Sequence, residues 1–270
     1  MTRPTCQPIH TFPAAAARKL TYFFTDIDDT LSSDGQITSM AYQAVWELHQ
    51  AGIKVVPVTG RPAGWCDMIA RMWPVEAVIG ENGAFYFHYD RTSRRMIREF
   101  FQTEDQRREG KRRLAELQHQ VLEQVPGCDI SADQPYRIAD LAIDFCEDVD
   151  PLDDQSIAKI CELATDLSLT WKVSSIHVNC WYGEFDKVTC LKKFLAKHCE
   201  TTLKHFQNSM VYIGDSPNDE PMFAEVENSI AVANINRFLD SLDHLPAYIT
   251  TSPSGQGFQE AVRHILRSQV

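Results

Sequence analysis

The chain has 270 residues, of which 44% are hydrophobic, and its formal net charge is −11. This length allows one large or two modest domains with a buried core, and the negative charge argues against a nucleic-acid partner. No apolar stretch approaches the roughly 18 residues that a membrane span needs. The eight cysteines are scattered without a metal-binding spacing. We therefore expect a cytoplasmic protein with reduced thiols and with no membrane or nucleic-acid partner.

The elements expected along the chain alternate between strands and helices. Residues 1–19 contain three prolines and no acidic residue, and we expect them to form a disordered extension. From Leu20 onward, apolar β-type runs alternate with helical runs, which predicts parallel βαβ units. The expected strands are 20–25, 53–58, 77–79, 211–214, 229–232 and 247–250, and the expected helices of this part are 39–51 and 259–267.

The first expected strand ends in two carboxylates, Asp26 and Asp28, followed by the hydroxyl of Thr30. A buried strand does not hold such charges unpaired, whereas open α/β sheets bind ligands at this end of their strands. Two close carboxylates repel unless a cation lies between them or one is protonated. The run therefore indicates a divalent metal site, most simply for Mg²⁺. A capped turn is the alternative, while a Ca²⁺ loop fails because Leu31 and Ile37 replace its glycine and glutamate.

A second acidic segment follows the apolar run that ends at Gly214. Its polar residues are Asp215, Asn218, Asp219 and Glu220. A helix start with a capping side chain is the alternative interpretation, although a helix N-terminus after a strand also favours bound anions. Three acids and an asparagine within six residues are more than capping requires, so we expect a second half of the metal site here.

Two shorter signals point to phosphate. The second expected strand leads into Thr59, Gly60 and Arg61, whose hydroxyl and backbone N–H groups suit a phosphoryl oxygen. Asp186 is expected to cap a helix that begins at Lys187. A lysine at that end opposes the helix dipole, which pairing with a bound phosphate or with the aspartates would explain. A solvated surface lysine is the alternative.

These four segments, in this order, resemble the haloacid dehalogenase superfamily of phosphatases. The family pattern is strand–Asp-x-Asp-x-Thr, strand–Thr/Ser-Gly-Arg, a lysine that opens a helix, and strand–Gly-Asp-x-x-Asn-Asp. The run from Glu81 to Ala84 also resembles the branch with Cof-type, sucrose-phosphate, trehalose-phosphate and mannosyl-3-phosphoglycerate phosphatases. One departure is Asp29, where many of these relatives have glycine.

The middle of the chain has a different pattern. We expect a hairpin around Asp90, a helix over 103–124, a strand over 138–145, a second helix over 154–167, and one or two strands over 170–181. This α+β segment, residues 85–184, is inserted between core segments 20–84 and 185–270. The resemblance implies an α/β fold: a Rossmann-like parallel sheet core with an inserted α+β cap of type IIB.

The resemblance also implies roles for the residues of the four segments. Asp26 would be the nucleophile that forms an aspartyl-phosphate, and Asp28 the acid and base. Mg²⁺ would be held by Asp26, the backbone carbonyl of Asp28, and Asp215. The phosphoryl oxygens would be bound by Thr59, the N–H of Gly60, and Lys187. Asn218 and Asp219 would order metal-bound waters and Lys187.

Substrate choice is expected to lie with the cap. His177, Asn179 and Trp181 alternate on one expected strand and so share a face. That face could hydrogen-bond and stack on a sugar; a solvent-facing sheet surface is the alternative. Further candidates are Arg61, which lies next to a motif, and, more weakly, Arg137 and Asp144.

We therefore expect a Mg²⁺-dependent phosphatase that hydrolyses a small phosphate ester, a phosphorylated sugar or sugar-like metabolite. The alternatives are a phosphomutase of a hexose phosphate with the same core, and a nucleotide or vitamin-phosphate phosphatase. A catalytically silent binding domain is disfavoured, because Asp26, Asp28, Lys187 and Asp215 are all present. Nothing in the sequence identifies the natural substrate or the oligomeric state.

Overall fold

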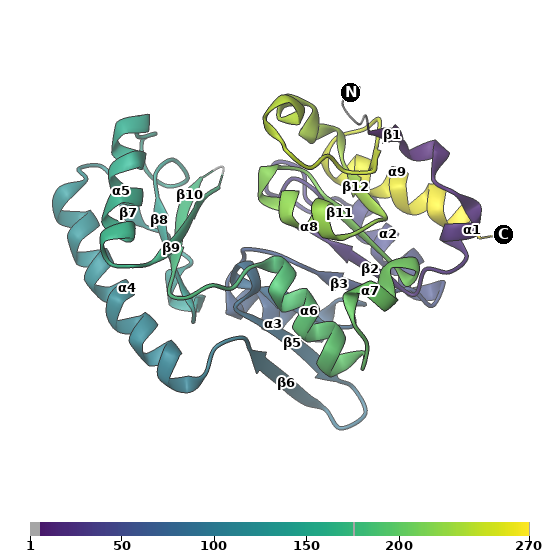
Figure 1. Cartoon of the computed structure of the whole chain (residues 1–270), viewed down its shortest axis with the longest axis horizontal. Helices are drawn as coiled ribbons and strands as arrows, with labels where there is room; N and C mark the ends of the chain where they lie inside the picture. Colours follow the sequence, from purple (N-terminus) through teal and green to yellow (C-terminus); the bar gives the residue numbers. More distant parts are fainter. Residues whose placement is uncertain (1–5, 175, 270) are drawn as a thin grey trace.

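The computed structural model describes residues 6–174 and 176–269. Six parallel strands form the core sheet in the order β1-β13-β12-β11-β2-β3 (Figure 1). Their bounds are β1 Gln7–Pro8, β2 Tyr22–Thr25, β3 Lys54–Pro57, β11 Met210–Gly214, β12 Ser229–Ala231 and β13 Tyr248–Ile249. The parallel α/β core expected from the alternating runs is therefore confirmed.

Both faces of the core sheet are covered by helices, which explains why the two central residues of β2, Phe23 and Phe24, are both apolar. Phe23 points into a cluster with helices α2 (Ser39–Gln50) and α9 (Ser254–Arg267). Its neighbour Phe24 points to the opposite face, into a cluster with α6 (Lys187–His198) and α8 (Glu220–Glu225). Successive side chains of a strand alternate between faces, so a strand buried on both sides must be apolar at every position.

The register of the sheet brings the sequence motifs to one edge. Thr25 of β2 pairs with Ile213 of β11 on one side and with Pro57 of β3 on the other. All three strands run parallel, so their carboxyl ends lie together and the residues that follow them are neighbours. This register is why Asp26 and Asp215, 189 positions apart in the sequence, come together.

The expected hairpin forms, but beside the core and not in the insertion. Strands β5 (Phe85–Asp90) and β6 (Arg95–Phe100) make a three-stranded sheet with β4 (Val78–Gly80). A parallel bridge between Val58 and Ile79 joins this sheet to the β3 edge of the core. Phe85 and Phe87 pack against helix α3 (Ala63–Met72), which the sequence analysis did not identify. The insertion therefore begins after Phe100 and not at residue 85, because the apolar face of the hairpin is buried against the core.

The insertion forms a separate α+β layer, as expected. Its antiparallel sheet has the order β7-β8-β10-β9, and two helices cover one face (Figure 1). The elements are α4 Glu104–Gln124, β7 Asp129–Ile130, β8 Asp140–Asp144, α5 Asp154–Asp166, β9 Thr170–Val173 and β10 His177–Trp181. Leu117, Ile143, Ile160 and Val178 belong to its own apolar core. Within the described residues, no helix has the length and apolar character to cross a membrane.

Residues 6–19 are folded, which corrects the expectation of a disordered extension over 1–19. Strand β1 pairs with β13 at the edge of the core sheet, with Gln7 opposite Tyr248. Ile9 and Phe12 are buried, and the ring of Phe12 lies 5.0 Å from that of Tyr248. The segment covers a sheet edge and buries apolar side chains, which offsets the entropy that ordering costs. Residues 1–5 lie outside the described residues.

Helix α9 begins at Ser254, earlier than the expected residue 259. Two glycines, Gly255 and Gly257, lie in its first turn. A Cβ atom on Gly257 would lie 2.2 Å from the carbonyl oxygen of Ser252, and one on Gly255 would lie 2.9 Å from that of Leu31. Here glycine allows close packing of the helix on the core instead of ending it.

Candidate active site

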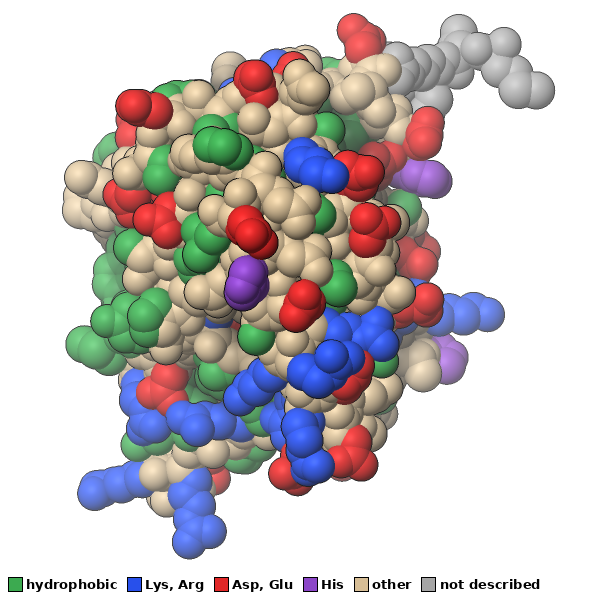
Figure 2. Space-filling model, turned by 90° about the vertical axis from the view of Figure 1, so that its left-hand side faces the viewer, with side chains coloured by type: hydrophobic (Ala, Val, Ile, Leu, Met, Phe, Trp, Pro, Cys, Tyr) green, Lys and Arg blue, Asp and Glu red, His purple; other side chains and the backbone are tan. Residues whose placement is uncertain are grey.

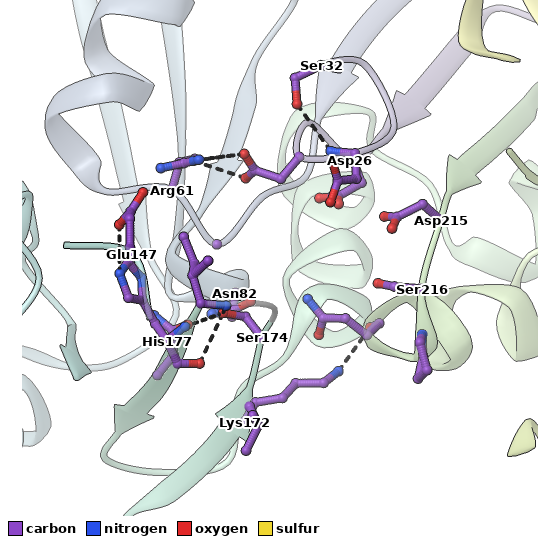
Figure 3. A pocket seen from close by; sticks show the side chains of 18 of the residues that line it. Asp26, Ser32, Arg61, Asn82, Glu147, Lys172, Ser174, His177, Asp215 and Ser216 are labelled. Carbon is purple, nitrogen blue, oxygen red and sulfur yellow. Dashed lines mark hydrogen bonds and ion pairs between the residues drawn. The ribbon is translucent and has the colours of Figure 1, made fainter. Parts of the chain in front are cut away.

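A cavity of about 550 Å³ lies between the cap sheet and the carboxyl ends of the core strands (Figure 3). Side chains from both layers line it. The core contributes Asp26, Asp28, Asp29, Gly60, Arg61, Asn82, Asp215 and Asn218, and the cap contributes Arg137, Glu147, Lys172, Ser174, His177 and Asn179. The cavity therefore brings together most of the site residues predicted from the sequence.

Lys187 is buried beside two aspartates. Its ammonium group lies 3.1 Å from Asp26 and 2.8 Å from Asp219. Asp186 caps α6 in a reciprocal arrangement with Thr189, so the helix begins at the lysine. Burial alone would lower the pKa of Lys187, but Asp219 and Asp26 raise it. The interpretation as a solvated surface lysine is wrong, and pairing with the aspartates explains why a cation opens this helix.

Asp219 is fully occupied as an acceptor. One of its oxygens accepts from Lys187 and from the hydroxyl of Tyr212, and the other accepts from the backbone N–H of Asp215 and of Ser216. Burial would raise its pKa, but Lys187 and these donors lower it. Asp219 is therefore a fixed charge that holds Lys187 and the turn after β11, as the sequence analysis expected for its contact with the lysine.

Asp26 and Asp215 make the group that best fits a divalent cation. Oxygens of these two residues and of Asp219 all lie within 4.8 Å of one another, and Thr30 donates a hydrogen bond of 3.2 Å to Asp215. Burial raises the pKa of Asp26 to about 7 and that of Asp215 to about 9, with a contribution from the neighbouring carboxylates. Three buried carboxylates face the single charge of Lys187, so a bound cation would relieve their repulsion.

Two other groups of possible metal ligands fit less well. They are Glu76 with His88 and His198, and Asp144 with Glu147 and His177. The ammonium of Lys54 lies 3.2 Å from Glu76 and opposes a second cation there. Asp144 accepts from the backbone N–H groups of three residues that follow it, so its oxygens hold the turn that carries Glu147. Asp144, a weak candidate for substrate contact, is therefore a turn residue.

These pKa shifts predict how Mg²⁺ affects stability. Asp26 and Asp215 have folded-state pKa values above the value of about 4 in an unfolded chain. Without metal, the folded state holds protons that the unfolded chain releases, so stability falls as pH rises from about 4 toward 9. Because a metal needs deprotonated ligands, we expect Mg²⁺ to raise the melting temperature more at about pH 8.5 than at about pH 6. Melts with Mg²⁺ or a chelator test this, and equal shifts at both pH values would contradict it.

Asp28 is held by Arg61. The guanidinium donates to both carboxylate oxygens, with distances of 3.0, 3.0 and 2.7 Å. Arg61 also lies over the ring of Trp65, and both members of the ion pair line the cavity. The residue after Asp28 adopts a left-handed conformation, with φ of +54° at Asp29. That conformation favours glycine, which explains the glycine of many relatives, although aspartate tolerates it.

The Thr59–Gly60 turn lies at the cavity wall. The hydroxyl of Thr59 is buried and accepts a hydrogen bond of 3.0 Å from the backbone N–H of Arg61, which leaves its proton free to donate. Gly60 lines the cavity, and its carbonyl accepts from Arg137 of the cap at 3.1 Å. A Cβ atom at Gly60 would lie 3.2 Å from the side chain of Asn82, so a larger residue would crowd the turn.

The three cap candidates divide into two kinds. His177 and Asn179 line the cavity, but Trp181 does not. Trp181 stacks on Phe185 at 5.6 Å in an apolar cluster that includes Phe85. The three side chains share a face of β10, but the cavity ends before its last residue. The expectation that Trp181 contacts substrate is therefore wrong in this structure, because the tryptophan packs where the cap joins the core.

The sequence did not indicate the contacts of several residues at the site, one of which, Arg137, was only a weak candidate for substrate contact. Buried Glu81 accepts from the backbone N–H groups of Ala63, Ile138, Ala139 and Asp140, and so ties the core to the cap. Arg137 pairs with Asp133 and Asp140 at the same junction. Lys172 and Glu147 enter the cavity from the cap (Figure 3). Lys172 lies opposite Asn179 in the cap sheet, and this register is what a prediction of its place in the cavity would have needed.

A second hollow opens where α3 and the β5–β6 hairpin meet α4. Its lining includes the cations Arg71, Arg98, Arg107, Arg108 and Lys111. Figure 2 shows Lys and Arg side chains gathered over the lower part of the face that carries the cap. Its acids, Asp67 and Glu104, are not among the described groups suited to a metal. We therefore place the chemistry in the first cavity.

The comparisons with known proteins identify the family of this chain. The sequence matches the haloacid dehalogenase-like hydrolases over residues 23–122 and 137–253. The chain therefore belongs to the haloacid dehalogenase-like hydrolase family, and the expectation of an enzyme of the phosphatase class is confirmed.

Individual relatives extend the likeness over most of the chain. Phosphoglycolate phosphatase 1 of Saccharolobus solfataricus is 25% identical over 248 residues, which cover 90% of this chain and 95% of the relative. A solved structure from Thermoplasma acidophilum matches with a TM-score of 0.70 at 17% identity, covering 92% of this chain and 98% of that one. The sucrose-phosphatase of a Synechocystis species, in complex with sucrose and phosphate, matches with a TM-score of 0.61 at 16% identity, again covering 92% and 98%. These two structures support the fold alone.

Proposed function

We propose that this hydrolase is a Mg²⁺-dependent phosphatase that acts on a phosphorylated sugar or sugar-like metabolite through an aspartyl-phosphate intermediate. The observation that carries the proposal is the arrangement around Asp26. This buried carboxylate ends a central strand, contacts Lys187 at 3.1 Å, and lies within 4.8 Å of Asp215 on the neighbouring strand. A nucleophile, a phosphate-binding cation and a metal-binding carboxylate are thus adjacent.

The proposed reaction has two steps. An oxygen of Asp26 attacks phosphorus, the bond from phosphorus to the ester oxygen breaks, and Asp28 gives its proton to the leaving alcohol. Water then attacks the phosphorus of the aspartyl-phosphate and gives a proton to Asp28. The bond to Asp26 breaks, inorganic phosphate leaves, and both carboxyl groups regain their starting states. In the structure Asp28 contacts Arg61, so the role of Asp28 requires one of its oxygens to turn toward the leaving group.

The remaining residues orient and stabilise the transferred group. Lys187, the hydroxyl of Thr59 and the N–H of Gly60 would bind phosphoryl oxygens, whose charge dominates the transition state. Asp26 and Asp215, with the backbone carbonyl of Asp28, would hold Mg²⁺. Bound there, Mg²⁺ neutralises charge between the nucleophile and the phosphoryl group. Asn218 lines the cavity, in a position to order water beside this group.

The cavity supports a small substrate. Its volume of about 550 Å³ suits a metabolite. His177 and Asn179 offer polar groups to hydroxyls. One relative is named a sucrose-phosphatase and another a phosphoglycolate phosphatase. From these names we infer only that the substrate of this chain is a small phosphate ester. We also propose that the enzyme is cytoplasmic, because its eight free cysteines would stay reduced there.

The direct test is a screen for phosphate release. Purified protein is assayed with a panel of sugar phosphates, nucleotides and vitamin phosphates, with Mg²⁺ and with a chelator. We expect Mg²⁺-dependent release of inorganic phosphate, fastest with sugar-like esters. Isomerised sugar phosphate without phosphate release would instead indicate the phosphomutase. Fastest turnover of nucleotides or vitamin phosphates would overturn the sugar assignment.

Replacing Asp28 tests the proton-transfer step. Asp28→Asn keeps the shape of the side chain but cannot carry the proton, so we expect kcat to fall by roughly 10²–10⁴-fold. The loss should be smaller for p-nitrophenyl phosphate, whose leaving group needs little protonation. Asp34→Asn is the matched control, because it makes the same change on an exposed residue that does not line the cavity, and it should keep its activity. Equal losses on both kinds of ester would argue against an acid role for Asp28.

A further inference from the structure

Lys172 enters the cavity from the cap and has no assigned role. It lies on β9 opposite Asn179 of β10. Residues directly opposite in an antiparallel pair point to the same face, so the lysine shares the cavity-facing side with Asn179. Figure 3 shows its side chain extending from the cap toward the turn after β11 in the core. The cap thus brings a cation to the side of the cavity that faces the proposed phosphoryl site.

Among the described residues, no acidic side chain forms an ion pair with Lys172. The Lys172 ammonium donates a hydrogen bond of 3.0 Å to the backbone carbonyl of Asn218. Three other cations near the site are paired: Lys187 with two aspartates, Arg61 with Asp28, and Arg137 with acids of the cap. A fourth, Arg237, lines the cavity and lies over the ring of Phe238. An ammonium has three donors, and one carbonyl uses only one of them.

Partial burial makes the charge of Lys172 costly. Desolvation, together with repulsion from Lys187, lowers the pKa of Lys172 to about 8, although Asp219, Asp186 and Asp26 act in the opposite direction. A desolvated cation in a ligand cavity gains most from an anion that the ligand supplies. Within the cavity, Glu147 does not supply it, because that carboxylate lies 2.8 Å from the imidazole of His177.

We propose that Lys172 forms a subsite for a second anionic group of the substrate, a carboxylate or further phosphate on the alcohol part of the ester. The inference rests on the proposed phosphatase function and narrows its substrate class to acidic phosphate esters, such as phosphorylated sugar acids. The transferred phosphoryl group is bound by Lys187 and Asp26, while the cap lysine lies beside that site, next to Asn218, and would bind an anionic group on the alcohol part of the ester. Lys172 is thus a specificity residue that acts on binding and not on the chemical step.

The test uses pairs of esters that differ in one anionic group. The pairs are phosphoglycolate with glycol phosphate, 6-phosphogluconate with glucose 6-phosphate, and glucose 1,6-bisphosphate with glucose 6-phosphate. The wild type should prefer the acidic member of each pair. In Lys172→Met, kcat/KM for the acidic members should fall by roughly 10- to 100-fold, the effect of losing one charge-assisted hydrogen bond. Most of the fall should lie in KM, and p-nitrophenyl phosphate turnover should stay near the wild-type value.

Two control variants complete the design. Lys172→Arg keeps the charge and should retain the preference for acidic esters. Lys159→Met removes a partly exposed cap lysine on α5 that pairs only with Glu162 among the described residues, and should change nothing. If Lys172→Met lowers turnover of every ester equally, the lysine acts on the transferred phosphoryl group. If Lys172→Met changes the turnover of no ester, Lys172 only holds the cap to the core through its contact with Asn218. Either result overturns the inference.

Failure of the proposed function has a different pattern, in which no ester is hydrolysed with Mg²⁺. Calorimetric binding of phosphoglycolate and of glycol phosphate to Asp26→Asn, with and without Lys172→Met, then still decides the question. Tighter binding of phosphoglycolate that disappears with Lys172→Met supports the subsite. Equal binding of both esters contradicts it.

Discussion

Replacing Asp26 by asparagine should reduce turnover by on the order of 10⁵–10⁶-fold, the scale of loss when a covalent nucleophile is removed. The amide has nearly the shape of the carboxylate but is a poor nucleophile, and it offers one fewer anionic ligand to Mg²⁺. Folding should survive, because Lys187 keeps its contact with Asp219 at 2.8 Å. The measurement is phosphate release at saturating Mg²⁺, with circular dichroism as the check of the fold.

Asp34→Asn is the matched control for this variant. It makes the same change of charge on an exposed residue that does not line the cavity, and it should leave turnover unchanged. Substantial activity in a folded Asp26→Asn protein would remove covalent catalysis by this residue from the account.

Replacing Lys187 by methionine should damage both stability and catalysis. Methionine has a similar length, but Asp26 and Asp219 would lose their shared counter-charge while buried. Removing one member of a buried ionic cluster costs about 3–5 kcal/mol. We therefore expect a clear fall in the free energy of unfolding measured by urea denaturation in a chelator, together with turnover close to background.

The same helix offers a control for this change. Lys192→Met removes a half-exposed lysine that pairs with Glu225 at 3.1 Å, a contact worth about 0–1 kcal/mol. If the Lys187→Met protein were no less stable than the Lys192→Met protein, the buried ionic cluster would not contribute to the free energy of unfolding as its geometry implies.

The core and its site were predictable because several local signals agreed. The run from Tyr22 to Phe24 is aromatic at every position and is followed by the β-branched Thr25, a pattern that suits a strand buried on both faces. It then ends in carboxylates, and the same pattern recurs before Asp215. Parallel strands end at one edge, so these two signals together imply one site. The helix start at Lys187 followed from its N-cap, Asp186, which is local chemistry that a sequence displays directly.

What the sequence did not reveal depends on pairings between distant segments. Lys172 acquires its position from the register of β9 on β10 and from the contact of the cap with Asn218. Trp181 shares the face of Asn179, but where the cavity ends depends on how the cap meets the core. Likewise, the hairpin from Phe85 was correctly expected as a hairpin, yet its association with the core depends on packing against α3. Alternation along one strand does not contain this information.

The central claim is a phosphoryl group carried by Asp26, and trapping it is the most direct test. Protein with Mg²⁺ and a rapidly hydrolysed ester is quenched in acid within the first turnover, digested, and analysed by mass spectrometry. The account predicts a peptide that carries one phosphoryl group on Asp26, absent when a chelator replaces Mg²⁺ and absent in Asp26→Asn. Steady release of phosphate with no labelled peptide, or with the label on another residue, would contradict it.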